Sequence, residues 1–226
     1  MIPAVFNTIK AQFQRCIICE NSGHPKGICH SCRRLLPYRP KSCSRCNTPL
    51  GNKTLCDCHA LSFNHDHIAS VFYYEPPISS WIQDVKYRHD LFKARVLSNL
   101  IEPFLRVEGE WVVPIPLHRK KRQKRGFNQN EVFLHRALAS KRRFLKKGWL
   151  VRVEDFPGQI GQTRAQRHLN SKKAFLAASE VRDQRLLLFD DVFTTGATIS
   201  AAANQCKTNG AKNVRVLTIA HGSAQE

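Results

Sequence analysis

The segment Leu186–Ser200, LLLFDDVFTTGATIS, constrains the fold more than any other part of the chain. Its four apolar residues, Leu186–Phe189, predict a strand buried on both faces, because the run is short, does not alternate and ends abruptly in charge. Two carboxylates follow, Asp190 and Asp191, which we call the acidic pair. A hydroxyl-rich turn then leads into an amphipathic helix that ends at Gly210. Such a strand needs helices above and below it.

The turn after the acidic pair has the composition of a phosphate-binding loop. Backbone N–H groups at a helix N-terminus converge on an anion, and the helix dipole favours negative charge. Gly196 lets the main chain approach closely, and Thr194, Thr195 and Thr198 add hydroxyl donors. Ionised carboxylates only accept hydrogen bonds, so the acidic pair suits two neighbouring sugar hydroxyls. A 5-phosphorylated ribose has both kinds of group at this separation.

This segment resembles the 5-phosphoribosyl-1-pyrophosphate (PRPP) signature of type I phosphoribosyltransferases: an apolar strand, Asp-Asp, two spacer residues and Thr-Thr-Gly-x-Thr. The resemblance implies that the acidic pair holds the ribose hydroxyls. It also implies that residues Thr194–Thr198, with Gly196 and Ala197 among them, hold the 5-phosphate. A P-loop is excluded because the chain contains no G-x-x-x-x-G-K-[ST] run. The alternative is that the segment has a structural role only, as a buried strand that ends in an Asp-rich turn before a Thr-capped helix.

The charge of the chain indicates a phosphate-rich partner. Its 226 residues include 36 Lys and Arg against 17 Asp and Glu, a formal net charge of +19, so nucleic acid is the first candidate. No apolar run approaches the ~20 residues of a membrane span, and the first 15 residues lack a signal peptide's long apolar segment. We therefore expect a cytoplasmic protein without membrane insertion.

Eight of the nine cysteines form four close pairs near the N-terminus: Cys16/Cys19, Cys29/Cys32, Cys43/Cys46 and Cys56/Cys58. Three pairs are C-x-x-C, the spacing that lets two thiolates reach one tetrahedral ion. In a reducing cytoplasm this spacing favours zinc over disulfides. We predict a double zinc ribbon over residues 1–66, with two structural Zn²⁺ ions. Sequential pairing gives two four-cysteine sites, but the nine-residue intervals leave interleaved pairing open.

Residues 67–226 are predicted to form a parallel α/β sheet flanked by helices, because strand-like and helical segments alternate there. The apolar patterns predict strands at 71–74, which could be an edge strand, 111–116, 150–154, 186–189 and 214–221, and helices at 79–87, 91–105, 128–145, 164–175 and from 199 to 210. Ligands of such sheets lie at the carboxyl ends of the strands. Residues 117–119 and the acidic pair should therefore share one rim.

The segment Arg119–Arg125 has six basic residues in seven and leaves the strand at 111–116. We read it as a basic loop whose position on the rim suits a pyrophosphate with its Mg²⁺. Six charges exceed what one pyrophosphate needs, which is expected if a polynucleotide backbone also binds. A solvated loop is the alternative.

Taken in order, these features resemble the ComF family, competence protein F and proteins of DNA utilisation. The resemblance is carried by the paired cysteines, Lys86-Tyr87, Val113–Leu117, Arg125-Gly126-Phe127-Asn128-Gln129, the run from Gln162 to Phe175, and the PRPP-like loop. It implies a type I phosphoribosyltransferase-like fold and a role with single-stranded DNA in natural transformation, with DNA-uptake or helicase proteins as partners. By position, Leu117, His118 and Arg119 would hold the pyrophosphate. Further substrate or DNA contacts are expected from Lys86, Lys120, Lys121, Arg122, Lys124, Arg125, Asn128 and Gln129.

Two kinds of function remain open at this stage. As an enzyme, a glycosyltransferase of pentosyl groups, the chain would displace pyrophosphate from ribose C1, with Asp190 and Asp191 as catalytic residues. As a binding module, it would hold a nucleotide or a DNA terminal phosphate. A salvage phosphoribosyltransferase is the metabolic alternative. Enzymes of this fold that act on 6-oxopurines carry Asp where this chain has Thr194, which disfavours those bases.

Overall fold

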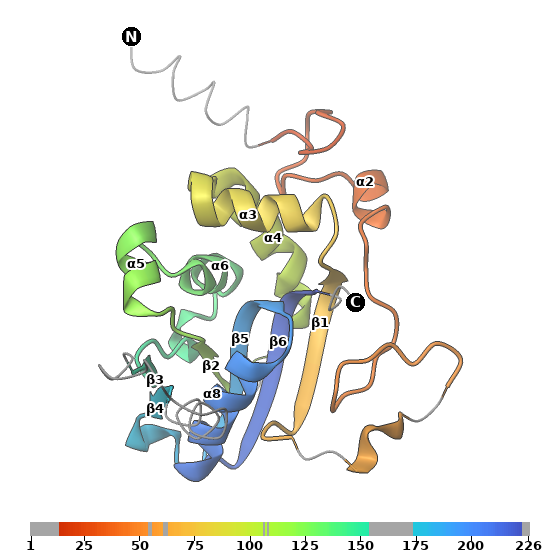
Figure 1. The fold of residues 1–226 in the computed structure, drawn as a ribbon. Helices are drawn as coiled ribbons and strands as arrows, with labels where there is room; N and C mark the ends of the chain where they lie inside the picture. The colour runs from red at the N-terminus through yellow and green to blue at the C-terminus, as the bar shows by residue number, and fades with distance from the viewer. Residues whose placement is uncertain are drawn as a thin grey trace, which may run out of the picture.

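A four-stranded parallel sheet forms the centre of the molecule (Figure 1), with strand order β1-β6-β5-β2. We obtained it in a computed structural model that describes residues 14–53, 56–60, 63–105, 107, 109–153 and 174–222. The strands are β1 (His67–Tyr73), β2 (Trp111–Pro114), β5 (Arg185–Phe193) and β6 (Asn213–His221). The predicted α/β class, the parallel pairing and the edge position of β1 are confirmed.

Strand β5 is buried on both faces, as its apolar run predicts. Leu187 and Phe189 pack on one side of the sheet and Leu186 and Leu188 on the other, in two separate apolar clusters. The strand is longer than predicted, because hydrogen bonding to β6 continues through Asp190 to Phe193. The acidic pair therefore lies within the strand instead of after it.

Three helices cover the face of the sheet that carries Leu187 and Phe189. They are α3 (Ile78–Arg88), α4 (Leu91–Ile101) and α6 (Gln129–Ala137). The break between α3 and α4 follows from local chemistry: His89 adopts a left-handed conformation with φ of 56°, and the Asp90 side chain accepts hydrogen bonds from two N–H groups of the next turn.

The other face is covered by α8 (Ala197–Thr208) and by a small antiparallel sheet of β3 (Leu150–Arg152) and β4 (Phe175–Ala177). As predicted, α8 stops just before Gly210, whose φ of 87° suits a residue without a Cβ atom. Shorter elements are the helix α2 (His30–Arg34) and 3₁₀ turns at Asp57–Ala60, Glu102–Phe104, Arg142–Phe144 and Ser179–Val181.

Several predicted boundaries are wrong. The helix predicted at 128–145 ends at Ala137, since the chain turns after Leu138 and then makes only a 3₁₀ turn. The helix predicted at 91–105 ends at Ile101. Most of the helix predicted at 164–175 lies outside the described residues, but its last residue, Phe175, belongs to a strand.

The basic segment Arg119–Arg125 is a helix, α5, and not the loop that we predicted. Lys, Arg and Gln form helices readily, and both ends are capped. The His118 ring accepts a hydrogen bond from the Lys120 N–H at 3.2 Å, and Gly126 ends the helix with φ of 79°. No helix in the described part of the chain is long and apolar enough to cross a bilayer.

Candidate functional site

The carboxyl ends of β2 and β5 bring the predicted site residues to one rim. The two strands are neighbours in register from Trp111 opposite Leu186 to Pro114 opposite Phe189. Residues 117–119, which leave β2, and the acidic pair at the end of β5 therefore lie at the same edge of the sheet, as predicted.

Asp191 is held in a buried ion pair. Its Oδ2 atom lies 2.6 Å from Nζ of Lys86, and the two side chains are only 7% and 17% exposed. The same oxygen accepts a hydrogen bond from Nε2 of Gln129 at 2.9 Å, and Arg125 donates to Oε1 of Gln129 at 2.5 Å. Three helices thus supply one connected network around a single carboxylate: Lys86 from α3, Arg125 from α5 and Gln129 from α6.

Asp190 lies beside this network but has a different partner. Its Oδ1 atom accepts hydrogen bonds from Nδ2 of Asn130 at 2.9 Å and from the Asp191 N–H at 3.0 Å. Burial, and then repulsion from Asp191, raises the pKa of Asp190 to about 7. This carboxyl group therefore changes charge near neutral pH, where an unperturbed aspartate is fully ionised.

Asn130 is a site residue that the sequence interpretation missed. It is fully buried and bridges the two strands, since Nδ2 donates both to Asp190 and to the Ile115 carbonyl oxygen at 3.0 Å. Asn128 donates to the same carbonyl oxygen at 3.2 Å and caps the N-terminus of α6. The signal was present, because Asn130 directly follows the Arg-Gly-Phe-Asn-Gln run, but an isolated asparagine predicts no partner.

The PRPP-like loop forms an open turn at the start of α8. Gly196 has φ of 74°, and a Cβ atom there would lie 3.0 Å from the Phe193 ring, so another residue would be strained in both respects. As the N-cap of α8, this glycine has no side chain to bond the first N–H groups of the helix. Thr194 and Thr195 are exposed beside them. The loop thus has the geometry of an anion site at the N-terminus of a twelve-residue helix.

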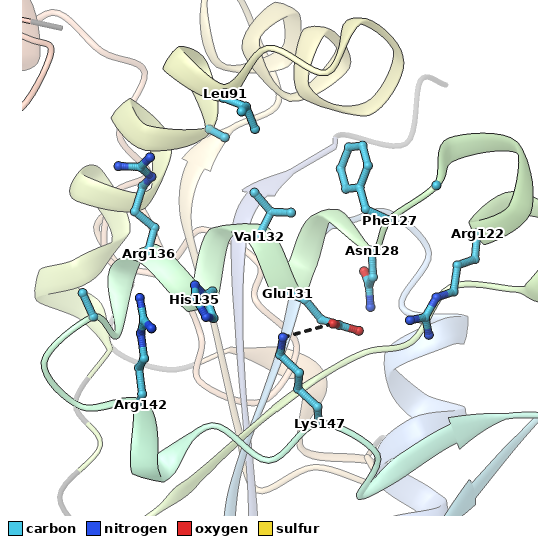
Figure 2. Close-up of a pocket in the computed structure, with 13 residues that line it drawn as sticks. Leu91, Arg122, Phe127, Asn128, Glu131, Val132, His135, Arg136, Arg142 and Lys147 are labelled. Carbon is cyan, nitrogen blue, oxygen red and sulfur yellow. Dashed lines mark ion pairs between the residues drawn. The ribbon is translucent and has the colours of Figure 1, made fainter. Parts of the chain in front are cut away.

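The remaining predicted residues fall into two groups. Lys86, Arg125, Asn128 and Gln129 bond to the acidic pair and the adjacent chain, and their expected contacts with substrate or DNA stay a prediction. Lys120, Lys121, Arg122 and Lys124 are exposed on α5. Of these, Arg122 lines a cavity of about 660 Å³ between α4, α5 and α6 (Figure 2).

The eight paired cysteines form two separate clusters, and the grouping is sequential. Within each cluster the four Sγ atoms lie within 4.8 Å of one another; the clusters are Cys16, Cys19, Cys29 and Cys32, and Cys43, Cys46, Cys56 and Cys58. The shortest separations, 3.4 to 3.8 Å, match the edge of about 3.8 Å that Zn–S bonds of about 2.3 Å give a tetrahedron. Both clusters could therefore hold a structural Zn²⁺ ion, and interleaved pairing is ruled out.

The two clusters join the rest of the molecule differently. Cys16 and Cys32 are buried in the same apolar cluster as α4, and Gly27 lies so close to Val96 that a Cβ atom would meet it at 2.6 Å. The second cluster is attached to β1 by polar contacts: the Ile68 N–H donates to the Ser44 carbonyl oxygen at 2.7 Å.

The chain is similar to curated proteins over most of its length. It is 30% identical to DNA utilization protein YhgH of Salmonella typhi over 204 residues, which are 84% of this chain and 88% of that protein. It is 26% identical to competence protein F of Haemophilus influenzae, over 91% of this chain and 96% of the relative. Competence protein ComFC of Streptococcus pneumoniae matches 66% of each chain at 24% identity. No protein-family model matches. From its similarity to these proteins, the chain belongs to the ComF family of competence and DNA-utilisation proteins.

Proposed function

We propose that this protein binds PRPP, or another phosphorylated ribose, with Mg²⁺ at the rim of β2 and β5, and that it serves the uptake or use of DNA in the cytoplasm. One observation carries the proposal: the acidic pair near the carboxyl end of β5 is followed, after the four residues 192–195, by a helix N-terminus whose N-cap is Gly196. The names of the relatives, which refer to competence and DNA utilisation, support the DNA role.

The hydrogen bonding of the acidic pair supports a sugar site. Among the described residues, the contacts to Asp191 go to Oδ2 and those to Asp190 go to Oδ1. Each carboxylate thus has one oxygen held by the protein and a second oxygen for a ribose hydroxyl. The 5-phosphate would then lie against Thr194–Thr198, and the pyrophosphate against residues 117–119. Bound Mg²⁺ would neutralise charge on the pyrophosphate.

Pentosyl transfer is the reaction that such a site could perform. Displacement of pyrophosphate from ribose C1 develops positive charge on the sugar, and the two carboxylates would stabilise it. Lys86 and Gln129 would orient Asp191 for this role through its other oxygen. The same arrangement also suits binding without turnover, so ligand binding is the property to test first.

Calorimetric titration of Mg·PRPP into the zinc-loaded protein tests the proposal. We expect saturable binding to the wild type and none to Asp190→Asn/Asp191→Asn. Asp183→Asn is the matched control, since Asp183 is exposed and Asn tolerates its left-handed conformation, with φ of 61°. Equal binding by all three proteins would refute the ribose role of the acidic pair. A folded wild type that binds no Mg·PRPP would exclude PRPP as the ligand.

A further inference from the structure

The cavity of about 660 Å³ (Figure 2) does not have the acidic pair in its lining. Helix α6 turns Gln129 and Asn130 toward the acidic pair, whereas Val132 and His135 line the cavity. Further walls come from α4, from the connection between α5 and α6, and from residues 139–147. The sequence interpretation expected substrate or DNA contacts from two of the lining residues, Arg122 and Asn128, but predicted no cavity, and the proposed ribose site does not use it.

Positive charge in the cavity is not balanced. Its lining includes Arg122, Arg136, Arg142 and Lys147. Among the described residues that line it, Glu131 is the one carboxylate, and Glu131 lies 3.4 Å from Lys147. Partial burial and the neighbouring Arg95 lower the pKa of Arg136, whose side chain is still exposed. A wall with this excess of guanidinium groups is complementary to an anion that carries more than one charge.

Apolar surface lies between the cationic groups. Leu91, which is 62% exposed, lines the cavity with Phe127 and Val132. Figure 2 shows Arg136 and Arg142 at one end of the cavity, Arg122 at the other and these apolar side chains between them. The arrangement suits a ligand with a flat apolar middle and negative charge on both sides.

We propose that this cavity binds a nucleotide unit of single-stranded DNA, with the base against Phe127 and Leu91 and the flanking phosphates on Arg122 and on Arg136 with Arg142. The inference rests on the DNA role within the proposed function and gives that role a location. Single-strand sites combine cationic grooves with aromatic contacts, and they tolerate any sequence because every base has a flat face. An acidic peptide would match the charges but would leave the apolar floor without a planar partner.

Fluorescence anisotropy with labelled dT20 and the full zinc-loaded chain tests the inference. We expect Arg136→Glu/Arg142→Glu to weaken binding by about tenfold or more and to lower the salt slope by about 0.7, the contribution of the single phosphate that the two arginines share. The control, Arg185→Glu/Lys212→Glu, reverses two exposed charges at the amino edge of the sheet and should change binding less than threefold, a change of roughly 0.6 kcal/mol or less. Phe127→Leu keeps an apolar side chain but removes the ring, and should weaken binding about fivefold with an unchanged slope.

The outcomes separate this inference from the function on which it rests. Wild-type affinity and slope in Arg136→Glu/Arg142→Glu would overturn the cavity assignment and leave the DNA role standing. Equal losses in the control pair would also overturn it, because net charge alone would then explain binding. A poly-glutamate peptide that displaces dT20 at equal charge concentration would overturn the nucleotide specificity. A wild type that does not bind dT20 would refute the DNA role itself, whereas Mg·PRPP titration reports on the rim site alone.

Discussion

The two proposed binding regions, the rim and the cavity, differ in how their charged side chains are paired. At the rim, both carboxylates have partners: Lys86 pairs with Asp191, and Asn130 bonds to Asp190. In the cavity, cations gather with little compensation (Figure 2), and Arg122, Arg136, Arg142 and Lys147 are all exposed. We therefore expect the rim residues to contribute to folding as well as to the proposed ligand binding, and the cavity residues to contribute to the proposed binding alone.

This contrast predicts how substitutions should divide between the regions. Removing one member of a buried, satisfied network leaves a partner uncompensated, so stability and ligand binding fall together. Removing an exposed cation from a crowded group relieves repulsion, so binding falls while stability is unchanged or rises. The predictions below run from the largest expected effect to the smallest.

Lys86→Met should lower the free energy of unfolding by about 3 kcal/mol, because it leaves Asp191 buried beside the apolar interior without its cation. Urea denaturation monitored by circular dichroism measures this loss. The matched control is Lys53→Met, which breaks the ion pair between Lys53 and Asp57. The side chain of Lys53 is 72% exposed and that of Asp57 is 90% exposed. That control should change stability by less than about 0.5 kcal/mol.

A double variant sharpens the same prediction. In Lys86→Met/Asp191→Asn no charge is left uncompensated, and the amide introduced at position 191 still offers an oxygen to Nε2 of Gln129. Much of the lost stability should therefore return. A loss below about 1 kcal/mol in the single variant, or no recovery in the double variant, would show that the rim network does not stabilise the fold.

Asp190→Asn should become more stable relative to the wild type as pH rises from 5 to 8. The pKa of Asp190 in the folded protein, about 7, lies above the value of about 3.9 for an unfolded aspartate. The folded state therefore binds more protons between these values, and wild-type stability falls as pH rises through that window. The asparagine oxygen can accept the same bonds from Asn130 and the Asp191 N–H. The variant's advantage should grow by on the order of 1–2 kcal/mol, measured as unfolding free energy across pH.

A pH-independent difference between Asp190→Asn and the wild type would contradict the raised pKa. The variant should also lose Mg·PRPP binding, because its amide oxygen takes the bonds from Asn130 and the Asp191 N–H, and the NH2 group left to face the sugar cannot accept a hydrogen bond. A variant that gains stability but loses ligand binding is expected when the replaced side chain serves function at a cost in stability.

The substitutions Arg136→Glu/Arg142→Glu should leave the free energy of unfolding within about 0.5 kcal/mol of the wild type, although they abolish the cationic end of the cavity. Both side chains are exposed, and neither belongs to an ion pair among the described residues. Thermal unfolding provides the measurement and also shows that weakened dT20 binding is not a folding defect. A loss of more than about 1 kcal/mol in the free energy of unfolding would show that these arginines, like the rim residues, stabilise the fold.

The rim could be predicted from the sequence because local patterns encode it. An apolar run fixes β5, the acidic pair follows it, and Gly196 with Ala197–Thr208 gives the helix N-terminus, all within one continuous segment. Cysteine spacing likewise predicted both clusters, since four thiolates close to one another in sequence need only short loops to meet.

Long-range partners could not be predicted in the same way. Lys86 and Asp191 are far apart in the chain, and their contact depends on how α3 packs over the sheet. The cavity joins residues of α4, α5 and α6, each of which alone has the pattern of a solvated surface position. The α5 helix was predicted as a loop because its basic residues show no apolar period, although its end caps and helix propensity were readable.

The pKa of His135, which lines the cavity, should show the smallest of the predicted effects, and it tests directly whether DNA enters the cavity. Partial burial lowers the pKa of its imidazole, and the nearby cations Arg142 and Lys147 lower it further. DNA phosphates in the cavity would offset that repulsion, so the pKa of His135 should rise when dT20 is added. NMR titration of the ring protons measures this pKa. Arg142→Gln should raise the pKa in the free protein and reduce the further rise on binding. A pKa of His135 that is identical with and without bound dT20 would mean that the strand passes elsewhere, because a phosphate within the cavity must alter the field at this ring.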